Sequence, residues 1–391
     1  MAIPSRPLCG GNTLNPWARR ITKPGEVPFL DLTREARRLK PELLAAFEQV
    51  LESGVFLFGP KIDELEREIA RRTGARYAVA AASGTVALEI LLRAFGVGPG
   101  DEVITTPASF YASAKTVAAT GATPIFADVL PGSYNLDPEK AVARITPRTK
   151  AIMAVHLYGR PAEVKELRSV AERSGIVLLE DAAQAFGASV DGRPVGSWGH
   201  GAALSFYPSK NVGALGDAGA VVTSDSAVAE RARSLAFLGY TSERDRFGPE
   251  GLAGRMDELQ AALLLVKLAH AAEMLERRLA AAARYDRELP PEWLRPAARP
   301  GVCDVRHLYV LRCADRDHVR QSLLARGIET KIHYAVPLHR QVLFAGRTEP
   351  LPIAESWARE VFSLPLYPDL SEPEQTSVVE AVADIHRQFN P

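Results

Sequence analysis

The chain has 391 residues, 47% of them hydrophobic, which is enough apolar material for the core of one large domain and a smaller one. Its 47 basic and 47 acidic residues balance, so no overall charge draws it to nucleic acid or to an anionic membrane, and we expect neither as a partner. Three cysteines, Cys9, Cys303 and Cys313, are too few and too scattered for a disulfide framework or a metal site, so we expect no metal and a reducing compartment.

The beginning of the chain is rich in Pro, Gly, Asn and Arg, and this composition predicts a poorly ordered or surface-lying extension over residues 1–26. The first 20 residues contain no continuous apolar segment of the kind that a secretion signal needs. Nowhere does an uncharged apolar run reach the length of a membrane span. We therefore expect a cytoplasmic protein that is neither secreted nor inserted in a membrane.

From Val27 onward, short apolar runs alternate with segments of helical periodicity. The expected strands are at 77–83, 101–106, 123–129, 151–156, 176–181, 202–207 and 220–225, and the expected helices between them are at 85–96, 112–121 and 162–175. Strand, helix and strand in repetition predict a parallel sheet with helices on both faces. We therefore place a large α/β domain, which would bind a cofactor, at residues 27–256.

The last third of the chain predicts a smaller α+β domain. A long amphipathic helix is expected over 254–285, with Asp257 as its N-cap and with Leu259, Leu263, Val266 and His270 on one side. After it, the pattern predicts strands at 307–313 and 328–334 and helices at 316–327 and 372–389. The linking helix and the small domain together span residues 257–391.

Several polar residues lie at the ends of predicted strands, which is where open parallel sheets bind ligands. Asp181 ends one strand, and Gln184 follows it three residues later. Ser205 ends another, five residues before Lys210, which lies in a glycine-rich turn between two apolar runs. Each has an ordinary alternative when taken singly, as a helix cap, a solvated lysine or, for His156 at a third strand end, a core histidine with satisfied partners.

Taken together, these residues supply what catalysis with pyridoxal 5'-phosphate (PLP) requires. The aldehyde of this cofactor needs a lysine of lowered pKa in a fixed position, and Lys210 is the candidate. The pyridine nitrogen needs a rigidly held carboxylate, which Asp181 offers at its strand end. Gln184, one helical turn later, could reach the phenolic oxygen of the ring.

The phosphate and the ring face of PLP need two further features. A phosphate binds well at a helix N-terminus, and the sequence Ser-Gly-Thr at 83–85 opens a predicted helix, to which Ser205 can add a hydroxyl. The ring wants an aromatic neighbour, and Phe110 or Tyr111 follows another predicted strand. The combination predicts a PLP enzyme.

Four segments carry a resemblance to a known family: AASGTVALEILLRAFGVGPGDEVIT, EDAAQAFGA, LSFYPSKNVGALGDAGAVVT and RMDELQAALLLVKL. In this order, and over nearly everything from Val27 to the C-terminus, the chain resembles the DegT/StrS family of PLP-dependent sugar aminotransferases. The resemblance implies the type I aminotransferase fold, PLP as cofactor, and a homodimer whose active sites are shared between subunits.

The resemblance also implies roles for single residues. It implies Lys210 as the lysine that bonds to the aldehyde, Asp181 on the pyridine nitrogen, Gln184 on the ring oxygen, Gly84, Thr85 and Ser205 on the phosphate, and Phe110 stacked on the ring. Family members usually carry Asn two residues before the Arg of the RM motif, where it reaches the phosphate of the neighbouring subunit, and this chain has Ala253 there. Arg255 itself is either a ligand or a salt-bridge partner at the helix end.

The substrate expected from the resemblance is a keto sugar that receives an amino group from an amino acid, glutamate or glutamine. The lysine segment and IHYAVPLHRQ most resemble members that aminate C3 of nucleoside-diphosphate 3-keto-6-deoxyhexoses. His333, Tyr334 and His339 would then lie near the sugar or the diphosphate, whose charge favours protonated histidines, or they are ordinary polar positions. A 4-keto nucleotide sugar and an aminocyclitol ketone remain alternative substrates.

Two other functional classes compete with this interpretation. A nicotinamide-dependent dehydrogenase needs Gly-x-Gly-x-x-Gly after the first strand, whereas GALGDAG has the wrong spacing and comes late in the chain. A non-catalytic sensor that binds PLP in the same fold is the second alternative. The presence of Lys210, Asp181 and Gln184 argues against the sensor.

Overall fold

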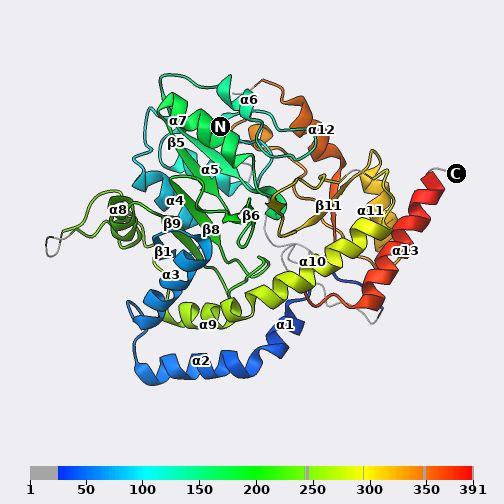
Figure 1. Cartoon of the computed structure of the whole chain (residues 1–391), viewed down its shortest axis with the longest axis horizontal. Helices are drawn as coiled ribbons and strands as arrows, with labels where there is room; N and C mark the ends of the chain where they lie inside the picture. Colours follow the sequence, from blue (N-terminus) through cyan, green and yellow to red (C-terminus); the bar gives the residue numbers. More distant parts are fainter. Residues whose placement is uncertain (1–24, 242, 244–245, 294, 347–348, 390–391) are drawn as a thin grey trace, which may run out of the picture.

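The structure is a computed structural model that describes residues 25–241, 243, 246–293, 295–346 and 349–389 (Figure 1). The extension predicted at 1–26 lies almost entirely outside the described residues. No helix in the described part of the chain combines the length and the apolar character that a membrane span needs.

Helices and strands alternate from residue 77 to residue 181, as the periodicity predicts. The helices are α1 (Leu32–Arg38), α2 (Lys40–Ser53), α3 (Pro60–Thr73), α4 (Gly84–Ala94), α5 (Ala112–Ala119), α6 (Pro138–Val142), α7 (Val164–Ser174), α8 (Ser226–Ala236), α9 (Glu258–Ala269), α10 (Ala271–Glu288), α11 (Arg316–Ala325), α12 (Pro352–Glu360) and α13 (Glu372–Phe389). The strands are β1 (Tyr77–Ala81), β2 (Glu102–Thr105), β3 (Thr123–Phe126), β4 (Thr149–Val155), β5 (Val177–Asp181), β6 (Ser189–Val190), β7 (Arg193–Pro194), β8 (Gly201–Ser205), β9 (Gly219–Thr223), β10 (Val302–Cys303), β11 (Tyr309–Arg312) and β12 (Val361–Leu364).

The centre of the molecule is a seven-stranded sheet with the order β1-β9-β8-β5-β4-β2-β3. Strands β3, β2, β4, β5 and β8 pair in parallel, and β9 runs antiparallel to both β8 and β1. The mostly parallel sheet predicted from the sequence is therefore confirmed. At β9 the direction reverses, and the loop that joins β8 to β9 contains no crossover helix of the kind that usually links parallel strands.

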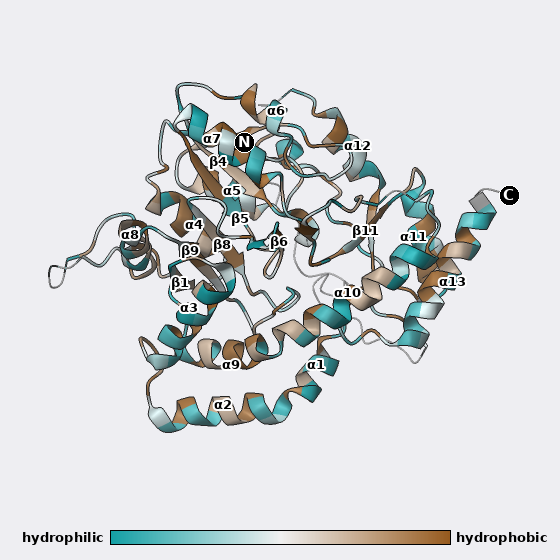
Figure 2. Ribbon diagram, in the orientation of Figure 1, coloured by the Kyte–Doolittle hydropathy of each residue, from teal (hydrophilic) through white to brown (hydrophobic). Residues whose placement is uncertain are grey.

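Helices cover both faces of this sheet (Figure 1). In β1, Val79 and Ala81 pack on one side against α4, α5 and α8, whereas Ala78 and Ala80 pack on the other side against α3 and α9. This period-2 alternation buries apolar side chains on both faces, as a covered sheet requires. Figure 2 shows the result as hydrophobic strands inside and hydrophilic stripes on the outer faces of the helices.

A second core lies between α10, α11, α13 and the two-stranded antiparallel sheet β11-β12. The prediction of a strand at 307–313 is confirmed by β11, but the prediction at 328–334 is wrong. That segment makes only isolated pairings, Ile328 with Val27 and Lys331 with Ser363. The partner of β11 is β12, a fully buried four-residue strand whose shortness gives no detectable alternation in the sequence.

The helix predicted over 254–285 is two helices. The first, α9, begins at Glu258 after Asp257, whose side chain makes no capping hydrogen bond. It ends at Ala269, because the backbone leaves helical geometry at His270 (φ −94°, ψ 3°), and α10 begins at Ala271. The predicted apolar side packs on α2, since Leu263 lies in one cluster with Leu39 and Leu43. The division of the chain into domains at residue 257 stays a prediction.

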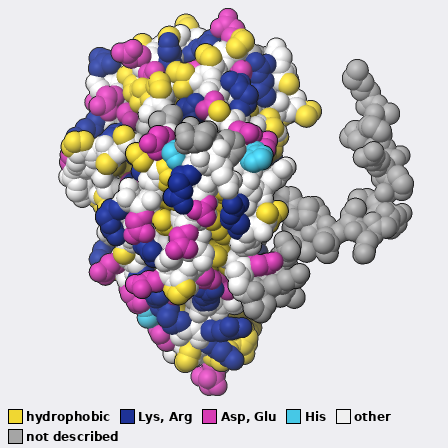
Figure 3. Space-filling view, turned by 90° about the vertical axis from the view of Figure 1, so that its right-hand side faces the viewer, with side chains coloured by type: hydrophobic (Ala, Val, Ile, Leu, Met, Phe, Trp, Pro, Cys, Tyr) yellow, Lys and Arg dark blue, Asp and Glu magenta, His cyan; other side chains and the backbone are white. Residues whose placement is uncertain are grey.

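The described part of the face in Figure 3 carries basic and acidic side chains that are interspersed with one another. This distribution agrees with the net charge of zero. Neither sign forms an extended patch on the described surface in this view.

Candidate active site

Lys210 lies in the loop that joins β8 to β9, and its N–H donates to the carbonyl oxygen of Tyr207 at 2.8 Å. The loop is tight: a Cβ at Gly213 would lie 2.2 Å from the carbonyl oxygen of Pro208, so only glycine fits there. Burial lowers the pKa of Lys210 to about 8, and the nearby negative charge of Asp181 partly opposes this. The structure thus holds a lysine amine that loses its proton far more readily than an ordinary lysine.

Asp181 is the last residue of β5 and is 4% exposed. Its carboxylate accepts hydrogen bonds from Ser113 Oγ at 2.6 Å and from the N–H of Ala183 at 3.2 Å. Ser113 was not among the predicted site residues. The available signal was a serine on the buried side of the alanine-rich helix α5, where an apolar residue is the default.

Gln184 connects Asp181's loop to residues from two other segments. Its Oε1 accepts from the N–H of Tyr158 at 2.7 Å, and its Nε2 donates to Tyr334 Oη at 3.1 Å. The Tyr334 ring lies 5.9 Å from that of Phe110, which is 54% exposed. The structure therefore brings Gln184, Tyr334 and Phe110 together, with a second hydrogen on the Gln184 amide to donate.

The three residues predicted to bind phosphate also meet. A Cβ added at Gly84 would lie 2.5 Å from Ser205 Cβ, so the tip of α4 and the end of β8 are in direct contact. The side chain of Ser83 accepts a hydrogen bond from the N–H of Val86, and its carbonyl oxygen accepts one from the N–H of Ala87. A helix leaves its first N–H groups without partners inside the helix, so those of Gly84 and Thr85 are available to an anion.

Arg255 is not joined to this cluster by a described contact. Its guanidinium stacks on the rings of Phe58 at 5.6 Å and Phe237 at 5.2 Å, and its Nη1 is buried without a hydrogen-bond partner among the described residues. Two residues earlier, Ala253 is exposed. A donor that is buried and unpaired in one subunit is what a ligand or a second subunit would satisfy.

The two histidines predicted near the substrate lie in different environments. Burial, with the charges of Lys331 and Lys210 adding to it, lowers the pKa of His333 to about 3, which argues against the expected protonated form of His333. Its Nδ1 pairs with Ser363 Oγ at 2.9 Å. His339 is 1% exposed, and its Nε2 lies 2.9 Å from Glu355 Oε1, so no cationic pair faces a common ligand.

Sequence reasoning also missed the contacts that tether the lysine loop. Asn211 Nδ2 donates to the carbonyl oxygen of Val305 at 3.1 Å, and its Oδ1 lies 3.2 Å from Nδ1 of His307. Burial and the charge of Lys210 lower the pKa of His307 well below its usual range, so the ring is neutral. Asn211 could have been noticed as a polar residue next to Lys210. Nothing in the sequence marks His307, because its place beside the lysine loop depends on how a distant segment packs.

His156, at the end of β4, is a buried structural residue, which was its ordinary interpretation. Its Nδ1 accepts from the N–H of Ala162 at 2.9 Å, so Nε2 carries the hydrogen and donates to Glu180 Oε2 at 3.0 Å. Glu180 also accepts from the N–H groups of Gly196 and Gly199. Burial alone would raise the pKa of Glu180, but the His156 bond and these N–H donors lower it.

The donor set fits PLP at each of its polar groups. A lysine of lowered pKa, a buried carboxylate fixed by two donors, an amide with a free hydrogen and an open helix N-terminus all derive from the ends of β5, β8 and α4. These ends lie at one edge of the sheet, because the carboxyl ends of parallel strands point the same way.

Comparisons with known proteins identify the family of the chain. A model of the DegT/DnrJ/EryC1/StrS aminotransferase family matches residues 37–383. The dTDP-3-amino-3,4,6-trideoxy-alpha-D-glucose transaminase of Streptomyces venezuelae is 44% identical over 365 residues, covering 92% of this chain and 96% of that protein. A protein of Geobacillus stearothermophilus named pleiotropic regulatory protein is 40% identical over 370 residues, covering 93% of this chain and 99% of that protein.

Among solved structures, NtdA of Bacillus subtilis with bound cofactor PMP superimposes with a TM-score of 0.87 at 31% sequence identity, covering 94% of this chain and 86% of that one. The fold expected from the resemblance, the type I aminotransferase fold, is confirmed. PMP is the aminated form of PLP, which agrees with the cofactor deduced from the residues. The chain therefore belongs to the DegT/DnrJ/EryC1/StrS aminotransferase family and is a PLP-dependent aminotransferase.

Proposed function

We propose that the enzyme transfers the amino group of glutamate or glutamine to the C3 ketone of a nucleoside-diphosphate 3-keto-6-deoxyhexose. The observation that carries the reaction type is Lys210, whose pKa is lowered to about 8 by burial and which lies near the Asp181 carboxylate. The substrate class rests on the Streptomyces relative, whose name places the new amino group at C3 of a dTDP sugar.

When bound, PLP supplies an electron-withdrawing ring that stabilises negative charge on the substrate carbon that loses its proton. Lys210 Nζ is the base for that proton and afterwards returns it, since a pKa near the working pH serves both directions. Asp181, held by Ser113 and Ala183, keeps positive charge on the ring nitrogen. The N–H groups of Gly84 and Thr85 and the Ser205 hydroxyl hold the phosphate.

The substrate would enter beside the loop of residues 331–334. His333 is neutral, so it can bind sugar hydroxyls through hydrogen bonds but cannot supply a positive charge. Lys331 is exposed, and its ammonium lies 5.3 Å from the Phe29 ring, where it offers charge to a diphosphate. We assign His339 to holding Glu355 rather than to the substrate.

Separate measurement of the two half-reactions by stopped-flow absorbance tests the substrate class. Glutamate or glutamine should convert the bound cofactor to its aminated form, and a dTDP-3-keto-6-deoxyhexose should convert it back. The donor half-reaction is the internal control for an intact active site. If a 4-keto nucleotide sugar or a cyclitol ketone drives the return while the 3-keto sugar does not, the substrate proposal is wrong and the aminotransferase assignment stands.

The lowered pKa of Lys210 predicts the pH dependence of covalent PLP binding by the cofactor-free protein. The neutral amine is the reactive form, so the rate should rise about tenfold per pH unit and level off above about pH 8, whereas an ordinary lysine would level off above about 10.4. Asp181→Asn should move the midpoint to lower pH, because the Asp181 charge raises the lysine pKa. A midpoint near 10 in the wild-type protein would contradict the burial argument.

We also propose that the enzyme is a homodimer. On α2, Leu44, Phe47 and Leu51 recur at helical spacing and share one side of the helix, next to the side that carries the buried residues Leu43 and Val50, and all three are exposed. Figure 1 shows α2 at the edge of the molecule with α9 on its inner side. Phe58, 66% exposed in the loop that follows, continues the apolar surface toward Arg255. So much contiguous apolar surface is typical of an interface between subunits.

Leu51→Arg is expected to weaken the dimer by placing a charge in this surface, because an unpaired charge in an apolar interface loses its hydration. Analytical ultracentrifugation over a dilution series should show monomer at concentrations at which the wild type is dimeric, together with lower activity. Val342→Arg is the matched control, since Val342 is 97% exposed and lies outside the apolar surface on α2. Fully active wild-type monomer would refute the shared site.

A further inference from the structure

Two buried serines form a hydrogen-bond chain that ends on Asp181. Ser113 Oγ lies 2.6 Å from Asp181 Oδ2, and Ser109 Oγ lies 2.7 Å from Ser113 Oγ. Ser113 is 1% exposed and Ser109 is 4% exposed, so water does not compete for these bonds. Ser113 lies in the first turn of α5 and Ser109 four residues earlier, in the segment that follows β2.

The direction of the chain follows from the number of hydrogens. A hydroxyl has one hydrogen, and an ionised carboxylate can only accept, so the hydrogen of Ser113 is given to Asp181. Ser113 Oγ is then the acceptor of its bond with Ser109, whose hydroxyl must donate. The bond from Ser109 polarises the Ser113 hydroxyl and so strengthens the bond from Ser113 to Oδ2 of Asp181.

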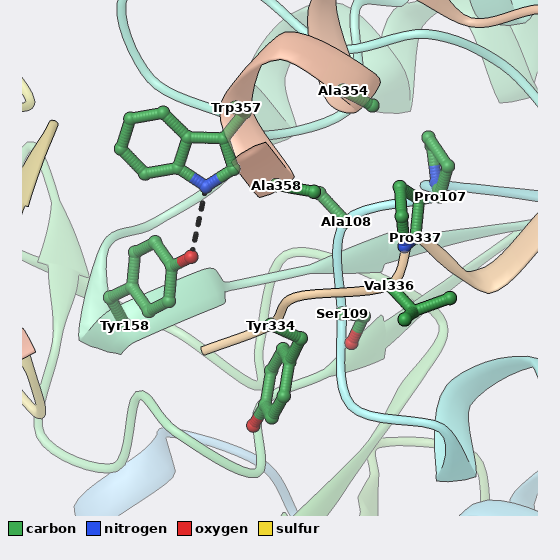
Figure 4. A pocket seen from close by; sticks show the side chains of 10 residues that line it. All are labelled: Pro107, Ala108, Ser109, Tyr158, Tyr334, Val336, Pro337, Ala354, Trp357 and Ala358. Carbon is green, nitrogen blue, oxygen red and sulfur yellow. Dashed lines mark hydrogen bonds between the residues drawn. The ribbon is translucent and has the colours of Figure 1, made fainter. Parts of the chain in front are cut away.

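The surroundings of Ser109 strengthen this chain of hydrogen bonds, because they are mostly apolar. Ser109 lies on the wall of a small cavity between the segment after β2, the loop of Tyr334 and helix α12, and Figure 4 shows its mostly apolar lining. The wall opposite is closed by Trp357, whose Nε1 donates to Tyr158 Oη at 3.0 Å. Mostly apolar surroundings strengthen a hydrogen bond relative to the same bond in water.

We propose that Ser113, and Ser109 acting through Ser113, are positioning residues of the aminotransferase reaction that fix the Asp181 carboxylate for the cofactor's ring nitrogen. The inference rests on the role of Asp181 in the proposed function. The other described donor to Asp181, the N–H of Ala183 at 3.2 Å, reaches Oδ1. Without Ser113, therefore, Oδ2 loses its donor and the carboxyl group can rotate away from the ring.

Ser113→Ala tests the proposal, with Thr116→Val as the matched control. Thr116 is in the same helix and fully buried, but among the described residues its hydroxyl bonds to the carbonyls of Ala112 and Ser113 and not to Asp181. Ser113→Ala should lower kcat about 10- to 100-fold, the effect of losing a hydrogen bond to a charged group, with little change in KM for the amino donor. Thr116→Val should leave kcat within about twofold.

Two readouts separate positioning from a general loss of structure. The visible circular dichroism of the bound cofactor reports the orientation of its ring and should change in Ser113→Ala, while the thermal unfolding of the cofactor-free protein stays close to that of Thr116→Val. Ser109→Ala should shift kcat and the dichroism the same way by less. The double variant should equal Ser113→Ala, because Ser109 acts only through Ser113.

Asp181→Asn separates the possible failures. If Ser113→Ala matches Thr116→Val in kcat and dichroism while Asp181→Asn is strongly impaired, the serine chain has no positioning role and the Asp181 assignment stands. Additive effects of the two serine substitutions would refute the chain order from Ser109 to Asp181. If Asp181→Asn itself turns over normally, the role of Asp181 and the inference fall together.

Discussion

Lys210→Ala is expected to lower kcat by at least about 10³-fold, because it removes both the amine that bonds to the cofactor and the base that moves the proton. The half-buried position of the side chain and its lowered pKa equip it for both tasks. Borohydride reduction of the wild-type enzyme, followed by peptide mass analysis, should locate the cofactor on Lys210, and the variant should carry none. The variant should still bind PLP non-covalently through Asp181 and the α4 N-terminus.

The matched control is Lys115→Ala. Lys115 is exposed on α5, so its loss should leave kcat and the reduction product unchanged. Trapping of the cofactor on any other lysine would overturn the assignment of Lys210. A variant that bound no PLP at all would point to a loop that fails to fold without the lysine, and the unfolding temperature of the cofactor-free variant would distinguish this outcome.

Patterns within single elements predicted most of the fold. The parallel sheet could be predicted because four of its strands, β1 to β4, are short apolar runs each followed by a helix, as with β4 and α7. The errors have a common cause. Tertiary contacts decide whether a very short strand forms and where a long helix breaks, and neither can be recognised from the local sequence pattern. Four residues suffice for β12 once β11 offers it a partner, and the long helix breaks at His270 although the apolar pattern continues.

The candidate site divides in the same way. Residues at strand ends, such as Asp181 and Ser205, could be identified from the sequence because topology alone brings the strand ends together. Supporting residues from other elements could not be identified. Ser113 reaches Asp181 only because of how helix α5 packs, and His307 reaches Asn211 in the lysine loop only because of how a distant loop packs. From the sequence we also expected a protonated His333, whereas burial favours its neutral form. Burial depends on the fold, so the sequence did not reveal it.

Asp181→Asn is expected to lower kcat about 100-fold or more while PLP remains bound. Asparagine keeps the size and one acceptor oxygen, but it cannot balance positive charge on the ring nitrogen, and losing such an electrostatic contribution costs roughly 3 kcal/mol in the transition state. The ring then withdraws electrons less strongly, so the proton abstraction by Lys210 slows. Single-turnover absorbance with the amino donor measures this step directly.

Asp128→Asn is the matched control for Asp181→Asn, because Asp128 is also a buried aspartate after a strand of the same sheet, and its carboxylate accepts from the N–H groups of Ile353 and Ala354. Its substitution should lower the unfolding temperature, since one acceptor oxygen at the start of α12 is lost, and leave kcat of the folded enzyme unchanged. Asp181→Asn should show the reverse pattern, with slow turnover and a smaller effect on unfolding. Near-normal single-turnover rates in Asp181→Asn would remove Asp181 from the reaction, because its charge near Lys210 would then have no chemical effect.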